Sequence, residues 1–204
     1  MIRHKEQRVG VFVDVQNMYY SAKQLYNSKV NFNAILKEAV SGRKLIRAMA
    51  YVIKADIGEE KNFFDALTNI GFDVRMKDLQ TFLGGAKKGD WDVGLAMDVT
   101  RMANKLDTVV LVSGDGDFMD MLEYVKAAGC RAEVIAFGKT ASSKLREEAD
   151  LIIDMDQNPR KFLIRSINTR TRKKPANPPK RTAKQKTVKN PEPAKPPIPK
   201  GANN

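Results

Sequence analysis

The feature that most constrains the fold of this chain is the alternation of short apolar runs with longer segments of helical periodicity. Runs rich in Val, Ile, Phe and Ala predict strands at residues 8–14, 45–53, 72–76, 108–112 and 131–137, with a further short strand at 151–154. Few polar residues interrupt these runs, which is typical of strands covered on both faces. The alternation predicts a three-layer α/β/α fold around a central, mainly parallel sheet of about five or six strands.

Helices are expected between the predicted strands, at about residues 17–27, 32–41, 59–70, 91–105, 116–128 and 141–148. Gly71 and Gly129 each stand between the end of a predicted helix and the start of a strand, where a glycine C-cap is common. Residues 78–89 are less regular and contain Gly84-Gly85. We interpret them as a mobile loop that leads into the helix at 91–105.

Charge is distributed unevenly along the chain. The formal net charge is +12, but the segment from Asn158 to the end holds 14 of the 36 Lys and Arg residues and one of the 24 Asp and Glu residues. Residues 165–204 also hold eight of the nine prolines and almost no large apolar side chain, so burial cannot offset the entropy of ordering them. We therefore predict a folded domain at residues 1–160 and a disordered, Lys/Pro-rich basic tail at 165–204.

The composition excludes several classes of protein. His4 is the only histidine, so a Ser-His-Asp triad, a Cys-His pair and a multi-histidine zinc site are unavailable. Cys130 is the only cysteine, which excludes an internal disulfide and predicts a buried structural thiol in a reducing cytoplasm. No stretch approaches the roughly 18 apolar residues of a membrane span, and the N-terminus has no signal-peptide-like apolar region. We expect a cytoplasmic location.

Acidic residues follow two of the predicted strands. The first strand ends in Asp14, with Asn17 three residues on, and the fourth is followed by Ser113-Gly114-Asp115-Gly116-Asp117. Sites in open α/β sheets form beyond the carboxyl ends of the strands, where the strand order reverses. If the order is 3-2-1-4-5, these acids meet in one crevice. Because clustered carboxylates repel one another unless a cation lies among them, we predict a divalent-metal site.

The predicted helix that starts near Trp91 adds further candidates. Asp90 and Asp92 lie at its start, where the helix dipole favours acids, and Asp98 lies about 120° around the helix from Asp92. Oxygen ligands favour Mg²⁺ or Mn²⁺ over zinc. Lys87 and Lys88 precede these acids and are interpreted either as cations that offset phosphate charge or as part of a solvated loop.

Several of these residues also have a purely structural interpretation. Asp90, Asp92 and Asp117 are each placed where a helix cap is needed, and Asn17 is a suitable N-cap. Ser113 is either a turn former or a ligand to metal or phosphate. Competing motifs do not fit: the glycine cluster of a dinucleotide-binding fold, a P-loop and an EF-hand loop all fail on spacing.

The acidic segments resemble those of the NYN domain family, a branch of the PIN-like nucleases, and within it the LabA-like group. The matching pieces are Val11–Asn17, Lys88–Asp98, Val110–Phe118 and Ser143–Asp150, and the resemblance covers residues 8 to 155. It implies a PIN-like α/β/α fold, an acidic pocket that binds Mg²⁺ or Mn²⁺, and cleavage of RNA phosphodiesters. The metal-binding and catalytic residues that it implies are Asp14, Asp92, Asp98, Asp115 and Asp117, with Asn17 as a polar partner. The spacing after Lys88 is one residue longer than in the family pattern, which leaves both Asp90 and Asp92 as candidates.

We therefore expect a metal-dependent endoribonuclease. Asn17, Ser113, Lys87 and Lys88 are expected to contact the substrate, and the basic tail is expected to act as an auxiliary RNA-binding arm. Two other interpretations stay open. One is a non-catalytic or regulatory nucleic-acid-binding module with a vestigial acidic pocket, and the other is a phosphatase or nucleotide hydrolase that uses the same pocket. The sequence does not define the oligomeric state, and a homodimer also stays open.

Overall fold

The computed structural model describes residues 4–54, 60–78, 80–81, 87–88 and 90–164. The predicted tail at 165–204 lies outside the described residues, as do residues 79, 82–86 and 89 of the predicted loop. Among the described residues, no helix is both long and apolar enough to cross a membrane.

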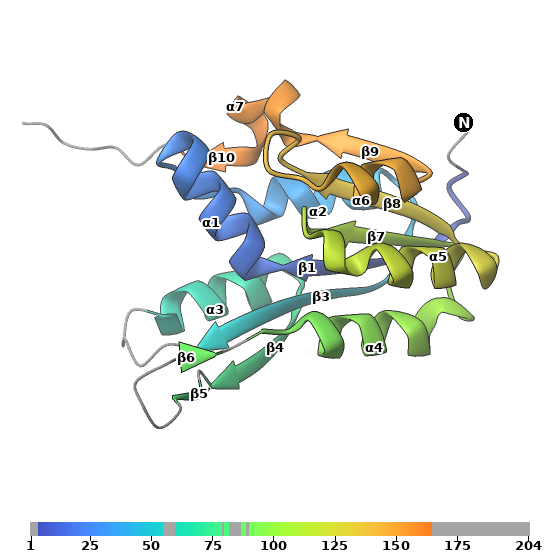
Figure 1. Cartoon of the computed structure of the whole chain (residues 1–204), viewed down its shortest axis with the longest axis horizontal. Coiled ribbons are helices and arrows are strands. Elements are labelled where there is room, and N and C mark those ends of the chain that lie inside the picture. The colour runs from blue at the N-terminus through green and yellow to red at the C-terminus, as the bar shows by residue number, and fades with distance from the viewer. Residues whose placement is uncertain (1–3, 55–59, 79, 82–86, 89, 165–204) are drawn as a thin grey trace, which may run out of the picture. The chain divides into compact units, whose positions relative to one another are not determined.

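A six-stranded sheet forms the centre of the fold, in the order β4-β3-β1-β7-β8-β9 (Figure 1). Its strands are β1 (Arg8–Asp14), β3 (Lys44–Lys54), β4 (Asp73–Asp78), β7 (Thr108–Val112), β8 (Arg131–Ala136) and β9 (Leu151–Asp154). Every neighbouring pair is parallel. The predicted parallel sheet is confirmed, and so is the reversal of strand order between the first predicted strand, β1, and the fourth, β7.

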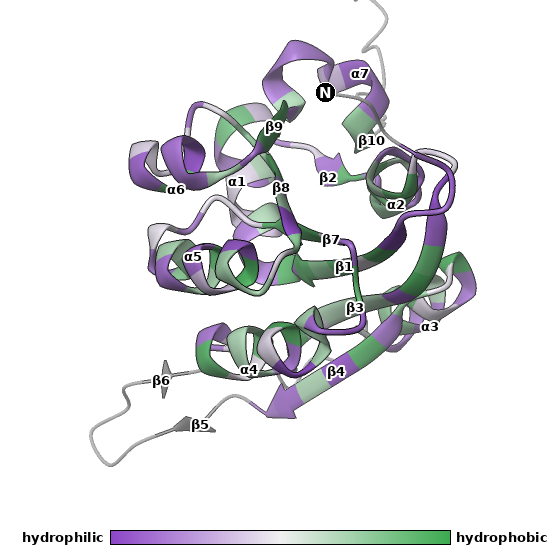
Figure 2. Ribbon diagram, turned by 90° about the vertical axis from the view of Figure 1, so that its right-hand side faces the viewer, coloured by the Kyte–Doolittle hydropathy of each residue, from purple (hydrophilic) through white to green (hydrophobic). Residues whose placement is uncertain are grey.

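Helices cover both faces of this sheet (Figure 2). They are α1 (Val15–Tyr26), α2 (Phe32–Val40), α3 (Glu60–Ile70), α4 (Asp92–Ala103), α5 (Met119–Ala127), α6 (Ser143–Glu148) and the short α7 (Pro159–Phe162). Side chains alternate between the faces along β1: Val11 and Val13 join the buried cluster under α1, α2 and α3, whereas Phe12 joins the cluster under α4, α5 and α6. The predicted three-layer α/β/α architecture is therefore confirmed.

Three helix starts differ from the sequence-based expectation. Asp14 is the N-cap of α1, because its Oδ1 accepts a hydrogen bond from the Asn17 N–H at 3.0 Å, so the prediction that Asn17 is an N-cap was wrong. The N-cap of α4 is Trp91, which makes no side-chain cap bond, so neither Asp90 nor Asp92 has that position. A 3₁₀ turn at Gly116–Phe118 precedes α5, and its N-cap is Asp115 rather than Asp117.

The two predicted glycine caps are confirmed. Gly71 and Gly129 have φ values of 112° and 85°, in the left-handed region that favours glycine. Cys130 follows the second cap and is 5% exposed, with its Sγ 3.0 Å from the carbonyl oxygen of Ala103 and 3.1 Å from that of Leu106. The prediction of a buried thiol is therefore confirmed, and burial raises the pKa of Cys130.

Two small antiparallel pairs were not predicted. β2 (Lys29–Val30) pairs with β10 (Leu163–Ile164), and β5 (Gln80–Thr81) pairs with β6 (Lys87–Lys88). A two-residue strand is too short to show a hydrophobic period, so the expectation of an irregular loop at 78–89 missed the second pair. The first pair and α7 continue the folded part past residue 160, since Phe162 is 3% exposed and packs in the core.

Candidate metal centre

The strand register brings Asp14 next to the loop that follows β7. Val13 pairs with Val112, so Asp14 and Ser113 follow side by side at the carboxyl edge of the sheet. Ser113 is fully buried; its hydroxyl donates to Asp14 Oδ2 at 3.3 Å and accepts from the Asp115 N–H at 3.2 Å. This position lets Ser113 hold the two carboxyl-bearing segments together from below the surface.

A second hydrogen bond holds the loop after β7 against α1. The side-chain oxygen of Asn17 accepts a hydrogen bond from the Gly114 N–H at 3.0 Å. A Cβ atom at Gly114 would lie 3.1 Å from the Cα of Ala141, so only glycine lets the loop approach this backbone without displacing it. Asn17 and Gly114 therefore determine where Asp115 lies relative to Asp14.

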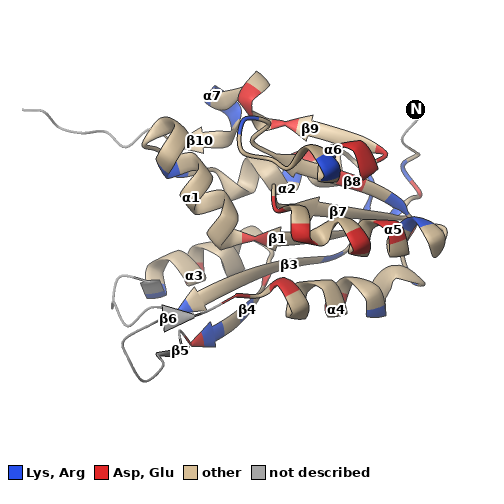
Figure 3. Cartoon of the chain, in the orientation of Figure 1, with Lys and Arg blue, Asp and Glu red and all other residues tan. Residues whose placement is uncertain are grey.

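Three further carboxylates meet at this edge. Asp92, Asp115 and Asp117 each place an oxygen within 4.8 Å of the other two. Asp92 is the first residue of α4, and Asp115 Oδ1 accepts the Asp117 N–H at 3.1 Å. Figure 3 shows the resulting acidic segments at the end of β1, at the start of α4 and between β7 and α5. Acids from three separate parts of the sequence thus converge.

The pKa values of this group reflect both burial and mutual repulsion. The pKa of Asp14 is raised to about 6, first by burial and then by the charges of Asp92 and Asp115, against the hydrogen bonds that lower it. The pKa of Asp92 is also raised, first by burial and then by Asp115, with Lys77 acting in the opposite direction. Repulsion of this kind is relieved when a cation lies among the carboxylates.

The start of α4 is held by an aromatic anchor. The Trp91 Nε1–H donates to the carbonyl oxygen of Val52 at 2.8 Å, and Lys77 Nζ lies 4.3 Å from the ring centroid. A Cβ atom at Gly94 would lie 2.6 Å from the same ring, so glycine permits the ring to pack on the first turn of the helix. These contacts fix the position from which Asp92 enters the cluster.

Asp98 is not one of the three carboxylates whose oxygens lie within 4.8 Å of one another. Its Oδ2 accepts a hydrogen bond from the Tyr51 hydroxyl at 3.1 Å, and its Oδ1 lies 3.6 Å from a guanidinium nitrogen of Arg101. Burial and the charge of Asp98 raise the pKa of Tyr51, which keeps this hydroxyl protonated as a donor. The structure thus gathers Asp14, Asp92 and the carboxylates after β7, while Asp98 contacts Tyr51.

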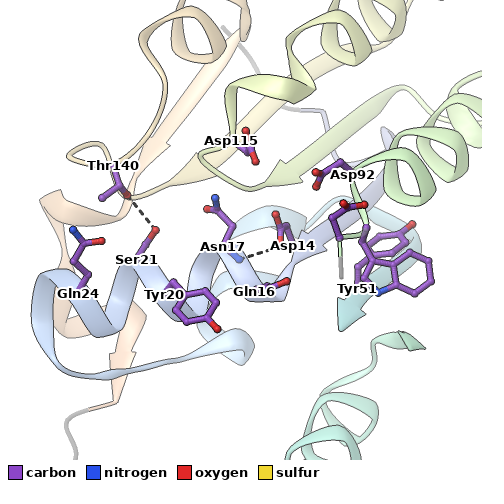
Figure 4. A pocket seen from close by; sticks show the side chains of 12 residues that line it. Asp14, Gln16, Asn17, Tyr20, Ser21, Gln24, Tyr51, Asp92, Asp115 and Thr140 are labelled. Carbon is purple, nitrogen blue, oxygen red and sulfur yellow. Dashed lines mark hydrogen bonds between the residues drawn. The ribbon is translucent and has the colours of Figure 1, made fainter. Parts of the chain in front are cut away.

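A pocket of about 360 Å³ opens over the cluster (Figure 4). Its lining residues are Asp14, Gln16, Asn17, Tyr20, Ser21, Gln24, Tyr51, Asp90, Trp91, Asp92, Asp115 and Thr140. Ser113, Asp98 and Asp117 are not among them. Sequence reasoning missed the α1 residues of this lining after Asn17, although their spacing from Asn17 is the helical one that places side chains on a single face.

The predicted lysines are only partly described. The backbone of Lys87 and Lys88 forms β6, but their side chains lie outside the described residues, so their contact with substrate stays a prediction. Lys77, which the sequence did not single out, is a described cation at the rim: its Nζ donates to the carbonyl oxygen of Asp90 at 3.2 Å.

The parallel α/β/α fold and the acidic residues at the carboxyl edge of the sheet are consistent with a PIN-like protein. Comparison with known sequences identifies the family. The model of the NYN domain matches residues 8–156, and the chain therefore belongs to the NYN domain family of PIN-like nucleases. The chain is 26% identical over 160 residues to the low amplitude and bright protein LabA of Synechococcus elongatus, covering 73% of this chain and 84% of that protein. It is also similar to the crystal structure of a protein of unknown function from Vibrio parahaemolyticus, with 31% identity, a TM-score of 0.72, and coverage of 80% of this chain and 100% of that one.

The donor chemistry of the cluster fits the divalent ion that this family uses. The available ligand atoms of Asp92, Asp115 and Asp117 are carboxylate oxygens close enough to share one ion. Hard oxygen donors suit Mg²⁺ and Mn²⁺. The raised pKa of Asp14 indicates that the folded chain holds negative charge here at a cost in stability, which is the condition that a bound cation relieves.

Proposed function

We propose that this protein is a Mg²⁺- or Mn²⁺-dependent endoribonuclease that hydrolyses RNA phosphodiester bonds at the carboxyl edge of its sheet. The observation that carries the proposal is the convergence of Asp14, Asp92, Asp115 and Asp117 beside a pocket, at the reversal of strand order, in a chain of the NYN family. A phosphodiester carries negative charge, so a bare acidic pocket would repel it, and the ion makes the site attractive to RNA.

The residues have separate roles in this proposal. Asp92, Asp115 and Asp117 hold the ion, and Asp14, fixed by Ser113, completes the anionic edge. When bound, the ion lowers the pKa of a coordinated water and stabilises charge on the phosphoryl oxygens. This chemistry needs no histidine, in agreement with the single His4 far outside the cluster in sequence.

Two further residues act on the site indirectly. Asn17 holds the loop that carries Asp115, and its amide nitrogen is available to the substrate beside the cluster. Asp98 accepts the hydrogen bond of Tyr51, whose side chain forms part of the pocket wall, so we assign it a positioning role next to the ion-binding carboxylates.

A cleavage assay tests the proposal. The full-length protein is incubated with single-stranded RNA in Mn²⁺ or in EDTA, together with Asp115→Asn and the matched control Asp120→Asn, an exposed acid that does not line the pocket. Wild type and Asp120→Asn are expected to cleave RNA only with Mn²⁺, and Asp115→Asn to be slower by at least about a hundredfold.

Four results contradict the proposal. Cleavage that persists in EDTA would show that the reaction needs no divalent ion, and cleavage that Asp115→Asn retains would show that it does not need this carboxylate. RNA binding without cleavage by wild type supports the non-catalytic module instead. Hydrolysis of mononucleotides but not of RNA supports a phosphatase or nucleotide hydrolase.

The basic tail is proposed as an auxiliary RNA-binding arm. Residues 165–204 hold 12 basic residues and one acid, Glu192, and such a chain neutralises phosphates and releases counterions. Truncation after Ile164 is expected to weaken RNA binding and flatten its dependence on salt, while cleavage of a very short oligonucleotide stays nearly unchanged. Binding measured across a salt series checks this, and an unaltered salt slope would exclude the tail as the nucleic-acid arm.

A further inference from the structure

Helix α1 presents an uncharged stripe to the pocket, next to the carboxylates. Asn17, Tyr20, Ser21 and Gln24 follow one another at the spacing that places side chains on one helix face, and all four line the pocket (Figure 4). The stripe begins beside Asp14 and extends about 10 Å along the helix, at 1.5 Å per residue. It therefore leads away from the acidic end without adding any negative charge.

Tyr20 is the conspicuous member of this stripe. Its side chain is 57% exposed, and its ring makes an edge contact with Tyr19 at a centroid distance of 5.4 Å. Lys23 Nζ lies 5.5 Å from the centroid of the Tyr19 ring, and this cation–π contact helps to hold the Tyr19 ring in place. Tyr20 thus adds little to the core, and its contact with the exposed Tyr19 ring holds its own ring beside the pocket.

The surrounding groups are hydrogen-bonding and neutral. The Thr140 hydroxyl donates to the Ser21 hydroxyl at 3.2 Å across the pocket. Ser21 is 8% exposed, so these two residues form the bottom of the pocket. Gln24 is exposed, and within the described part of the chain no hydrogen-bond partner is found for its amide or for the Tyr20 hydroxyl. An amide of this kind can both donate to and accept from the edge of a nucleobase.

We propose that this stripe is a nucleobase subsite, in which Tyr20 stacks on the base of the nucleotide next to the phosphate at the carboxylates and Gln24 binds the edge of that base. The inference rests on the proposed function, because the carboxylates determine where the phosphate lies. Aromatic rings beside a nucleic-acid track stack on unpaired bases of any identity, and purines offer the larger face. The subsite is therefore expected to bind an unpaired nucleotide, and to bind a nucleotide that carries a purine more tightly than an abasic one.

The experiment compares two substrates in the full-length protein. One is a short oligoadenylate, and the other has the same ribose-phosphate backbone without bases. Tyr20→Ala is expected to reduce kcat/KM with Mn²⁺ on the oligoadenylate by roughly five- to a hundredfold and to leave the abasic oligomer unchanged. Tyr20→Phe keeps the ring and should behave as wild type. Tyr124→Ala is the matched control, since Tyr124 is 44% exposed on α5 and does not line the pocket.

Binding of both oligomers with Mn²⁺, measured where wild type does not cleave them, separates the subsite from the chemistry. If wild type cleaves neither oligomer but Tyr20→Ala still weakens binding of the oligoadenylate alone, the subsite stands and the proposed hydrolysis fails. If wild type cleaves RNA but Tyr20→Ala affects both oligomers equally, or behaves as Tyr124→Ala does, the subsite is overturned and the hydrolysis stands. Failure of wild type to bind or cleave either oligomer overturns both.

Discussion

Charged side chains are arranged differently at the two ends of the parallel strands, which we call the amino edge and the carboxyl edge of the sheet. At the amino edge, the Arg43 guanidinium donates to both oxygens of Glu133 at 3.0 and 2.9 Å, and both side chains are almost fully buried. Arg131 adds a second cation 3.0 Å from the same carboxylate. At the carboxyl edge, like charges lie together instead, and burial together with the charges of Asp92 and Asp115 raises the pKa of Asp14.

This difference separates a structural use of charge from a functional one. A buried charge that is paired and hydrogen-bonded satisfies the fold without an external partner. Like charges held together by Ser113 and Asn17 destabilise the fold, so they indicate a ligand that the sheet edge is built to receive. Breaking the pair at the amino edge and relieving the repulsion at the carboxyl edge should therefore change stability in opposite directions.

The largest change in stability is expected at the amino edge. Glu133→Gln leaves Arg43 and Arg131 buried without a countercharge, and loss of one partner of a buried pair costs about 3–5 kcal/mol. Urea unfolding of the variant should show a corresponding fall in the free energy of unfolding. The matched control is Glu6→Gln, which removes a carboxylate from the exposed pair with Lys44 and should not change stability measurably. Similar losses in both variants would remove the contrast between buried and exposed pairs.

At the carboxyl edge, Asp14→Asn is expected to stabilise the protein in EDTA. The pKa of Asp14 is about 6 in the fold against an ordinary value of 3.8, so its ionised form costs on the order of 3 kcal/mol at pH 7. The Asn side-chain oxygen can still accept the bond from the Asn17 N–H that caps α1. Thermal unfolding in EDTA should give a higher midpoint for the variant, and Mn²⁺ should stabilise wild type more than the variant.

The stabilisation by Asp14→Asn is expected to depend on pH. Because the pKa of Asp14 is raised in the fold, wild type loses stability as the pH rises from about 4 to about 6, where the carboxyl group ionises. The advantage of Asp14→Asn should therefore be full above that range and vanish below it. An advantage that does not depend on pH would show that packing, not charge, separates the two proteins.

A small effect is expected for a second exposed pair at the amino edge, between Arg8 and Asp107. Arg8 binds Asp107 at 2.7 Å, but the two side chains are 47% and 39% exposed, so solvent screens the pair. Asp107→Asn should cost less than about 1 kcal/mol. Arg8 lowers the pKa of Asp107, so the difference should be present at neutral pH and disappear as the pH falls below about 4. A loss as large as that of Glu133→Gln would contradict this view of burial.

Most of the sheet could be predicted because its strands are apolar runs. The exception is the edge strand β4, which is mostly exposed and contains Asp73, Arg75, Lys77 and Asp78. The strand order was assumed from a common arrangement, since strand pairing depends on contacts that a single sequence does not display. The convergence of Asp14 and Asp115 followed from that assumption, because Asp14 ends β1 and Asp115 lies in the loop after β7. The contact between Asp98 and Tyr51 could not be predicted, since it depends on how α4 packs on β3.

The uncharged part of the pocket was harder to foresee than the acids. Carboxylates after buried strands are unusual and therefore informative, whereas Tyr20 and Gln24 resemble ordinary surface residues of an amphipathic helix. Thr140 lies across the pocket from α1 and is 119 residues distant in sequence from Ser21, its hydrogen-bond partner. Only the arrangement in space shows that these residues border the same pocket.

The most direct test of the contrast between the two edges is a calorimetric titration with Mn²⁺. Wild type and Asp120→Asn are expected to bind the ion with the same affinity, and Asp115→Asn is expected to lose at least about tenfold, because one of the three converging carboxylates is gone. Equal affinity in all three proteins would contradict the assignment of the carboxyl edge as a cation site, and like charges would then gather at this edge for some reason other than binding an ion.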